Sequence, residues 1–115
     1  MKLPEPHELV GLFGSEPRLA DRGVPWAYNR LTFSTSLEAD DVRVEVSPGY
    51  GHLSLTWRQG DETRAVLELN NVESLAVEET PPTLVISFEE SLPLGSLRLR
   101  LGPHVSLFWT VDPSI

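Results

Sequence analysis

The sequence predicts a mainly β fold: an antiparallel meander of about eight strands, curled into a sandwich or a barrel, with one short α-helix at the N-terminus. Two observations lead to this prediction. From Leu31 to Val111, apolar residues recur at every second position within short segments, which is the period of a half-buried strand. Glycine, proline, asparagine or paired acids separate the segments, and most links have the length of hairpin connections.

The first thirty residues have a different pattern. Apolar residues from Leu9 to Phe13 have helical spacing, follow two prolines and stop at Gly14, a typical helix end. Residues 15–30 show neither period and contain two further prolines, so they are predicted to form an irregular loop. We therefore expect a short helix that caps an open end or seam of the sheet.

The alternating segments define the predicted core. In chain order their inward residues are Leu31, Phe33 and Leu37; Val42, Val44 and Val46; Leu53, Leu55 and Trp57; Ala65, Leu67 and Leu69; Leu75 and Val77; Leu84, Ile86 and Phe88; Leu97, Leu99 and Leu101; and Val105, Leu107, Trp109 and Val111. Burying each large apolar side chain is worth roughly 1.5–3 kcal/mol. The sheet must therefore curl or be covered, and both tryptophans of this set are expected in the core.

Composition limits the classes of function. The 115 residues are expected to form one β-rich domain, with the helix and loop in 1–30 and the meander in 31–111. The net charge of −8 argues against nucleic-acid and membrane partners, because those surfaces need a basic footprint. No cysteine and no long apolar run is present, which favours a cytoplasmic protein. Lys2 is the one lysine among nine basic residues, a usage that hints at a bacterial source.

Three of the predicted turns contain paired acids. Alternate turns of a meander lie at the same end, so Asp40-Asp41, Asp61-Glu62 and Glu78-Glu79 should meet at one rim, here called the acidic rim. The turns at Tyr50, Asn70-Asn71 and Glu89-Glu90 should share the other end. The acidic rim has three interpretations: solvated turns, a docking surface for a basic protein, or a divalent-cation site. Because no Asp-x-Asp-x-Asp calcium loop is present, no metal is predicted.

No catalytic or cofactor motif is evident. His7, His52 and His104 form no His-x-x-x-His pair, and Ser15 lacks the Gly-x-Ser-x-Gly elbow of a nucleophile. We therefore predict neither an enzyme nor a cofactor.

Aromatic residues outside the strands are candidate contacts for a partner. Trp26 and Tyr28 lie in the irregular segment and Tyr50 lies in a turn, and such side chains often anchor protein interfaces. Trp26 could equally plug the mouth of the sandwich or barrel. The predicted partner-binding residues are thus Trp26 and Tyr28 together with Asp40, Asp41, Asp61, Glu62, Glu78 and Glu79.

A family resemblance supplies one specific hypothesis. The segment Glu8-Leu-Val-Gly-Leu-Phe-Gly14, then Pro17-x-Leu-x-Asp21, and later Leu67-x-Leu-x-x-Val72-x-Ser-Leu75 resemble patterns in small β-rich bacterial immunity proteins of polymorphic and contact-dependent toxin systems. The resemblance covers about a third of the chain, and its residues are not chemically specific. It implies a non-enzymatic inhibitor that covers a cognate toxin, often a basic nuclease, with an acidic surface.

Three hypotheses of function follow. The first is a protein-binding module, namely an immunity protein that inhibits a basic toxin. The second is a small β-barrel that carries an apolar ligand, which requires an unfilled core. The third is a structural or assembly subunit, in which a sheet face or edge pairs with a second copy of the chain.

Overall fold

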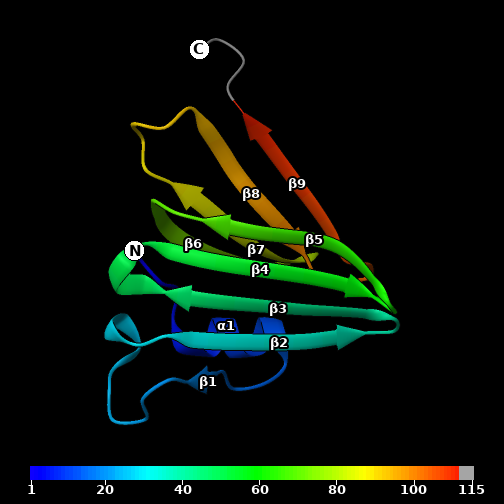
Figure 1. The fold of residues 1–115 in the computed structure, drawn as a ribbon, viewed down its shortest axis with the longest axis horizontal. Coiled ribbons are helices and arrows are strands. Elements are labelled where there is room, and N and C mark those ends of the chain that lie inside the picture. Colours follow the sequence, from blue (N-terminus) through cyan, green and yellow to red (C-terminus); the bar gives the residue numbers. More distant parts are fainter. Residues whose placement is uncertain (112–115) are drawn as a thin grey trace.

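The computed structural model describes residues 1–111, which form two antiparallel sheets and one α-helix (Figure 1). The elements in chain order are α1 (Pro6–Phe13), β1 (Arg18–Leu19), η1 (Trp26–Tyr28), β2 (Leu31–Leu37), β3 (Asp40–Ser47), η2 (Pro48–Tyr50), β4 (His52–Gln59), β5 (Glu62–Leu69), β6 (Val72–Glu79), β7 (Pro82–Phe88), β8 (Leu94–Arg100) and β9 (Ser106–Val111), where η marks a short 3-10 helix. No helix within residues 1–111 is long and apolar enough to cross a membrane.

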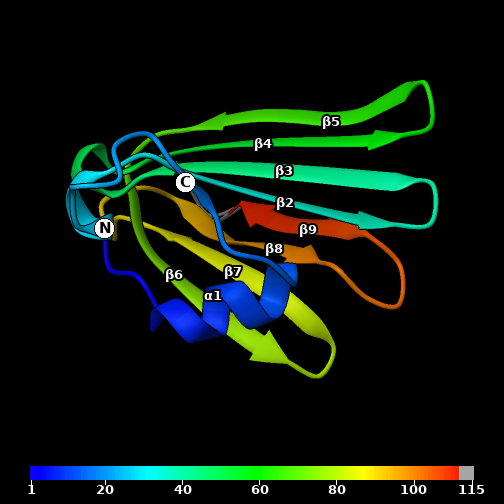
Figure 2. The same ribbon diagram turned by 90° about the horizontal axis from the view of Figure 1, so that it is seen from below.

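The two sheets are consecutive meanders. The first has the order β1-β2-β3-β4-β5 and the second has the order β6-β7-β8-β9. They lie as two layers without closing into a barrel, so the fold is a sandwich (Figure 2). The predicted mainly β, antiparallel architecture with one N-terminal helix is confirmed.

The chain passes between the layers at Asn70-Asn71, where the sequence suggested a tight hairpin or a bulge. That expectation was wrong, because β5 pairs with β4 and β6 pairs with β7, and no ladder joins β5 to β6 among the described residues. Asn71 takes a positive φ of 59°, which asparagine tolerates better than most residues. Leu69 and Val72 on either side of the link are both buried, so the chain crosses while keeping both flanking side chains in the core.

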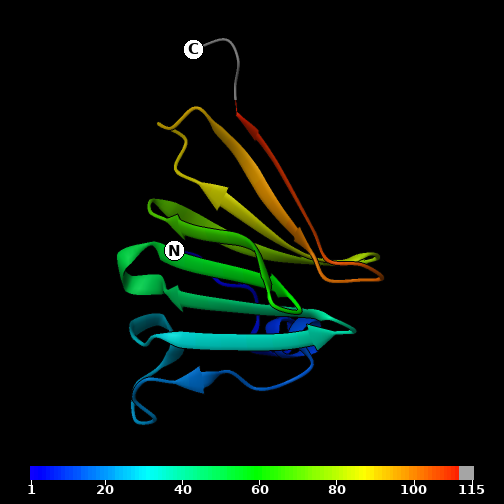
Figure 3. The same cartoon turned by 45° about the vertical axis from the view of Figure 1, so that its right-hand side comes forward.

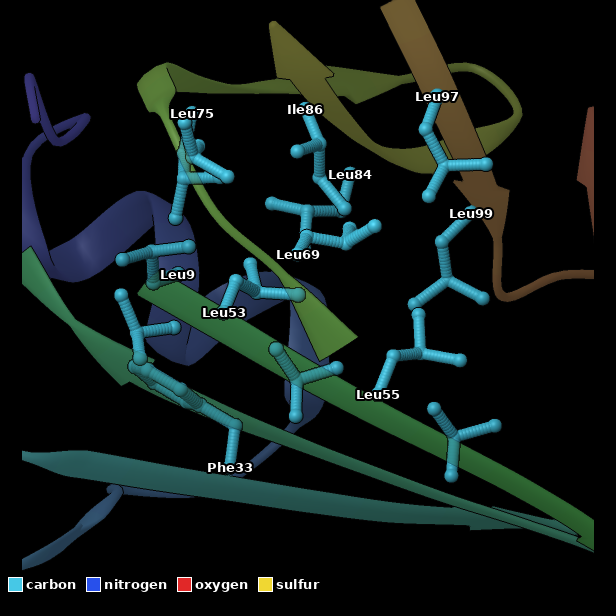
Figure 4. Packing of buried hydrophobic residues seen from close by; sticks show 14 of the residues in the cluster. Leu9, Phe33, Leu53, Leu55, Leu69, Leu75, Leu84, Ile86, Leu97 and Leu99 are labelled. Atoms are coloured by element: carbon cyan, nitrogen blue, oxygen red, sulfur yellow. The ribbon is translucent and has the colours of Figure 1, made fainter. Parts of the chain in front are cut away.

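Alternation fills the space between the layers. In the first sheet, Phe33, Val44, Leu55 and Leu67 lie side by side across four strands. In the second sheet, Ile86 lies beside Leu97 on the neighbouring strand. Figure 4 shows inward side chains from both sheets pointing toward one another, among them Phe33 and Leu55 of the first sheet and Ile86 and Leu97 of the second. Most of the buried core consists of the predicted alternate residues, joined by Leu9 and Phe13 of α1. The expectation was wrong for Val111, which is 58% exposed at the end of β9, and Trp57 is only half-buried against the core.

One irregularity in β6 changes which residues point inward. The register between β6 and β7 shifts between Val72 and Ser74. Because a bulge adds one residue to the strand, Val72 and Leu75 both lie in the core although three positions separate them. Simple alternation predicted Leu75 and missed Val72.

The helix covers the side of the sandwich next to β2, β6 and β7. At its start the Glu8 carboxylate accepts a hydrogen bond from the Glu5 backbone N–H at 2.9 Å. At its end Gly14 adopts a φ of 79° and its N–H donates to the Val10 carbonyl at 2.8 Å. Phe13 is buried and stacks on Phe33, with ring centroids 4.8 Å apart. The helix therefore covers an open seam, as the sequence predicted.

The segment predicted as a loop is held together by one buried amide. The Asn29 Nδ2 donates to the Asp21 carbonyl at 2.6 Å and to the Val24 carbonyl at 2.9 Å. Its Oδ1 accepts from the Asp21 N–H at 3.1 Å and from the Arg30 N–H at 2.9 Å. The same segment also contributes the two-residue strand β1, which the sequence did not predict.

Trp109 departs from its expected place in the core. It points inward like Leu97 opposite it, but β9 is an edge strand and Trp109 remains 37% exposed. Its ring stacks on Phe88 with centroids 5.5 Å apart, and its Nε1 donates to the Gly95 carbonyl at 3.0 Å. The alternation of residues predicted correctly that Trp109 lies on the inner face of the sheet. Its side chain remains partly exposed because β9 is the edge strand.

Candidate functional site

The strand reversals gather the connections at two ends of the sandwich. The links β2–β3, β4–β5, β6–β7 and β8–β9 lie at one end, at the right of Figure 2. The 3-10 helix η2, the Asn70-Asn71 link and the β7–β8 loop lie at the opposite end. These are the two groups of turns that a meander predicts. Each end therefore offers a separate candidate surface.

Three carboxylates of the acidic rim are engaged by other groups of the chain. Asp40 Oδ1 accepts from Trp57 Nε1 at 2.9 Å, and Asp41 Oδ1 accepts from Ser36 Oγ at 2.5 Å. Glu78 pairs with Arg98, with Oε1 and Nη1 2.6 Å apart. The hydrogen bond and charge of Glu78 raise the pKa of the Arg98 guanidinium above its ordinary value. These three side chains stabilise the sandwich as well as adding charge to its surface.

The remaining carboxylates of the acidic rim are Asp61, Glu62 and Glu79. All three are exposed, and no hydrogen bond or ion pair engages their side chains within residues 1–111. They belong to two separate layers, because the β4–β5 turn lies in the first sheet and the β6–β7 turn in the second (Figure 2). Within the described part of the chain, no three Asp, Glu or His side chains are placed to hold a metal ion.

A cleft occupies the other end of the sandwich. Its volume is about 550 Å³, which is within the usual range for ligand sites. We call it the tyrosine cleft, after Tyr50. Its polar lining residues are Tyr50, Asn71, Glu73, Glu89, Glu90 and Ser91. It combines the β3–β4, β5–β6 and β7–β8 connections, which are far apart in sequence.

Backbone hydrogen bonds join these three loops to one another. The Val72 N–H donates to the Gly51 carbonyl at 3.0 Å, and the Glu89 N–H donates to the Asn71 carbonyl at 3.1 Å. Gly51 has a φ of 62°, and a Cβ there would lie 3.3 Å from the Val72 carbonyl oxygen. Only glycine combines this conformation with such a close approach. The lining of the cleft is therefore fixed by main-chain geometry.

The tyrosine cleft is strongly acidic. Glu73, Glu89 and Glu90 contribute three carboxylates, and no lysine or arginine side chain is among the residues that line it. Met1 also lines the cleft, and its amino group donates to the Pro48 carbonyl at 3.4 Å. Carboxylates gathered in a concave surface concentrate negative potential there. This end therefore favours a cationic group over an anionic one.

Two exposed tyrosines flank the acidic groups. Tyr50 is 89% exposed at the cleft and Tyr28 is 81% exposed in η1. The two 3-10 helices pack against each other, which places Tyr28 at the same end as Tyr50. Trp26 also belongs to η1, but it is half-buried and packs edge-on against Phe33, with ring centroids 6.0 Å apart. This half-buried position agrees with the expectation that Trp26 plugs the open end of the sandwich.

The structure therefore divides the residues predicted to bind a partner. The six acids lie at the rim end, whereas Trp26 and Tyr28 lie at the cleft end, about 23 Å away along an eight-residue strand such as β3. Sequence reasoning did not select Glu73, Glu89 or Glu90 as site residues. A signal was present, because the turns of Tyr50 and Glu89-Glu90 were already grouped at one end. The chain crossing that brings Glu73 to them could not be seen in the sequence.

The histidines lie in separate elements. His52 Nε2 contacts Glu68 Oε2 at 2.9 Å on the outer face of the first sheet. His7 lies on α1 and His104 in the β8–β9 connection, and both are exposed. The expectation that each lies at a solvated position agrees with this placement for His7 and His104, and His52 is half-buried.

Comparisons with known proteins support the fold. No family model and no curated protein matches the sequence. A chain in the solved structure of a contact-dependent growth inhibition toxin–immunity protein complex from Klebsiella pneumoniae 342 superimposes with a TM-score of 0.75. The match covers 95% of both chains at 16% sequence identity. The present chain therefore shares the fold of a chain in that complex.

Proposed function

We propose that this chain is a non-enzymatic protein-binding module that acts as an immunity protein, covering and inhibiting a toxin with a basic surface. The observation that carries the proposal is the tyrosine cleft, where three glutamates and the exposed Tyr50 lie on segments joined by backbone hydrogen bonds. The exposed Tyr28 lies at the same end of the sandwich. The shared fold supports it, since the superimposed chain comes from a toxin–immunity protein complex.

The chemistry of the cleft fits an arginine- or lysine-bearing segment of the toxin. Arginine donates in a planar fork to carboxylates, so Glu73, Glu89 and Glu90 would each accept charge-assisted hydrogen bonds. Tyrosine supplies a large contact area at low cost in side-chain entropy, and Tyr28 and Tyr50 already protrude into solvent. Opposite charges on the two proteins would also accelerate association at low salt. The cleft would therefore contribute both to the specificity of binding and to a high association rate.

The acidic rim is the second candidate surface for the same partner. Asp61, Glu62 and Glu79 are the carboxylates there that no neighbouring side chain of the described residues engages. A toxin that docks on this end would meet them first. The two ends are too far apart for one small loop to contact both, so substitutions at each end distinguish the two surfaces.

The test takes the product of the reading frame immediately upstream of the gene for this chain as the candidate toxin. Its binding to the immobilised protein is measured by surface plasmon resonance for wild type, for E73Q/E89Q/E90Q and for the matched rim variant D61N/E62Q/E79Q. The cleft variant should bind at least about tenfold more weakly, and added salt should weaken the wild-type complex. Failure of the wild-type protein to bind this toxin or to protect cells that express it would reject the proposed function.

The apolar-ligand hypothesis loses its structural basis. It requires a closed barrel with an unfilled interior, whereas the sheets do not close and the inward side chains pack against one another (Figure 4). The third hypothesis, pairing with a second copy of the chain, has a specific observation in its favour that concerns β9.

A further inference from the structure

Every open sandwich has edge strands whose outer N–H and C=O groups can pair with another chain, and natural proteins usually protect them. Three of the four edges here are short, partly covered or charged. Strand β1 has only two residues and covers β2 at Leu31 and Thr32, and the rest of the β2 edge carries the polar run Ser34-Thr35-Ser36. Strand β5 carries Glu62, Arg64 and Glu68. At the start of β6, the Lys2 N–H donates to the Glu73 carbonyl at 2.7 Å and the Lys2 carbonyl accepts from the Leu75 N–H at 2.9 Å. The far end of β6 carries Glu78 and Glu79.

Strand β9 is the exception. Its six residues, Ser-Leu-Phe-Trp-Thr-Val, include no charge, proline or glycine, and within residues 1–111 no strand pairs with its outer edge. Phe108 is 65% exposed and Val111 is 58% exposed. Figure 3 shows the strand, in red, at the outer margin of the second sheet. A neutral, β-prone edge of this length is a template for strand addition.

The sequence of β9 also identifies its partner. In an antiparallel pair, residues opposite each other point to the same face, so two copies must align residues of equal parity. The register centred on Phe108 places Phe108 opposite its own copy, Leu107 opposite Trp109, and Ser106 opposite Thr110. Every cross-strand pair then matches in kind: aromatic with aromatic, apolar with apolar, and hydroxyl with hydroxyl. A register shifted to centre on Trp109 would instead place Phe108 opposite Thr110.

Charge also favours a second copy at this edge. The chain has a net charge of −8, but β8 and β9 contain Arg98 and Arg100 and no acidic residue. Arg98 lies one strand away from Phe108 and is neutralised by Glu78 at 2.6 Å. Its copy would lie three strand spacings distant, about 14 Å, beyond the screening length of about 8 Å in physiological salt. Two copies can therefore meet along β9 without bringing their acidic residues together.

We propose that two copies of this chain associate through antiparallel pairing of β9 with β9, centred on Phe108, to form one continuous eight-stranded sheet with two-fold symmetry. The contact would cover Phe108 on the outer face and Trp109 with Leu107 on the inner face. It leaves the tyrosine cleft and the acidic rim free. The proposal is independent of the proposed inhibition of a toxin.

The test is the molar mass in solution, measured by sedimentation equilibrium over a wide range of protein concentration. Wild type should pass from one chain to two as the concentration rises. F108K and F108E place like charges opposite each other at the two-fold axis, so each variant alone should remain a monomer, while an equimolar mixture should regain the dimer. V66K is the matched control, because Val66 is 61% exposed on the protected edge strand β5, and it should dimerise like wild type.

Several results would overturn the proposal. A wild-type protein that stays monomeric throughout the range excludes self-association through β9. Equal dimerisation of F108K and wild type, or loss of the dimer in V66K as well, places the contact elsewhere. If the two charged variants fail to associate when mixed although each is folded by circular dichroism, the register centred on Phe108 is wrong. If wild type is a monomer and F108K alone loses toxin binding, β9 docks the toxin and not a second copy.

Discussion

The indole of Trp57 donates a hydrogen bond to the carboxylate of Asp40 at 2.9 Å. Both residues are half-buried where β3 and β4 lie side by side, near the β2–β3 turn. An acidic residue that the sequence places in an exposed turn thus satisfies a tryptophan N–H that would otherwise be partly buried without a partner. Part of the charge at the acidic rim is therefore explained by the stability of the sandwich.

Replacing Asp40 should destabilise the protein. Asp40→Ala leaves the Trp57 N–H without its acceptor and should lower the free energy of unfolding by about 1–2 kcal/mol. Asp40→Asn keeps an acceptor oxygen and should lose less. Urea unfolding followed by tryptophan fluorescence measures both, with Asp61→Ala as the control for loss of one exposed carboxylate. Equal stability of the Asp40→Ala and Asp61→Ala variants would show that the hydrogen bond contributes nothing.

Asn29 should be the most sensitive residue of the segment between the helix and β2. Its buried amide donates to two carbonyls and accepts from two N–H groups, so Asn29→Ala should cost about 2 kcal/mol. Asn29→Asp retains the acceptor but turns a second carboxylate oxygen toward the carbonyls of Asp21 and Val24, and should not restore stability. Thermal unfolding of the two variants, with the exposed Ser15→Ala as control, checks this prediction.

Two glycines with the same backbone conformation should respond differently to alanine. Gly51 and Gly60 have φ values of 62° and 59°, but a Cβ meets the Val72 carbonyl oxygen at 3.3 Å only in the first case, since Gly60 has open space. Both variants should lose about 1 kcal/mol for the left-handed conformation. Gly51→Ala should lose more, because the loops that line the tyrosine cleft must shift. Chemical unfolding measures both variants. Equal unfolding midpoints would contradict the close approach of the Gly51→Ala Cβ to the Val72 carbonyl oxygen.

Much of the fold follows from the sequence because alternation and turn residues are local signals. The eight segments from β2 to β9, the helix ending at Gly14 and the grouping of turns at two ends were all predictable. The crossing at Asn70-Asn71 was not, since a two-residue link between apolar strands looks like a hairpin until the pairing partners of each strand are known. The exposure of Trp109 was missed for a related reason. Alternation predicts on which face of the sheet a side chain lies, but only the order of the strands shows which strand is at the edge.

The candidate site was less accessible to sequence reasoning. Paired acids drew attention to the acidic rim, yet Asp40, Asp41 and Glu78 are engaged by Trp57, Ser36 and Arg98, which are distant in sequence or across a turn. Of the three glutamates of the tyrosine cleft, Glu73 lies at the start of β6, and Glu89 and Glu90 lie in the β7–β8 loop. Their proximity depends on the loops joined by Gly51 and Asn71, and pairwise contacts of that kind leave no periodic signal.

The most direct test measures the dissociation constant of the complex with the candidate toxin, the product of the upstream reading frame. The constant is compared between variants at the two ends of the sandwich. E73Q/E89Q/E90Q should weaken the complex at least about tenfold relative to wild type, whereas D61N/E62Q/E79Q should change it much less. The two variants remove the same number of carboxylates, so a general charge effect would weaken both alike. A cleft variant that binds as tightly as wild type would contradict the assignment of the tyrosine cleft as the toxin-binding surface.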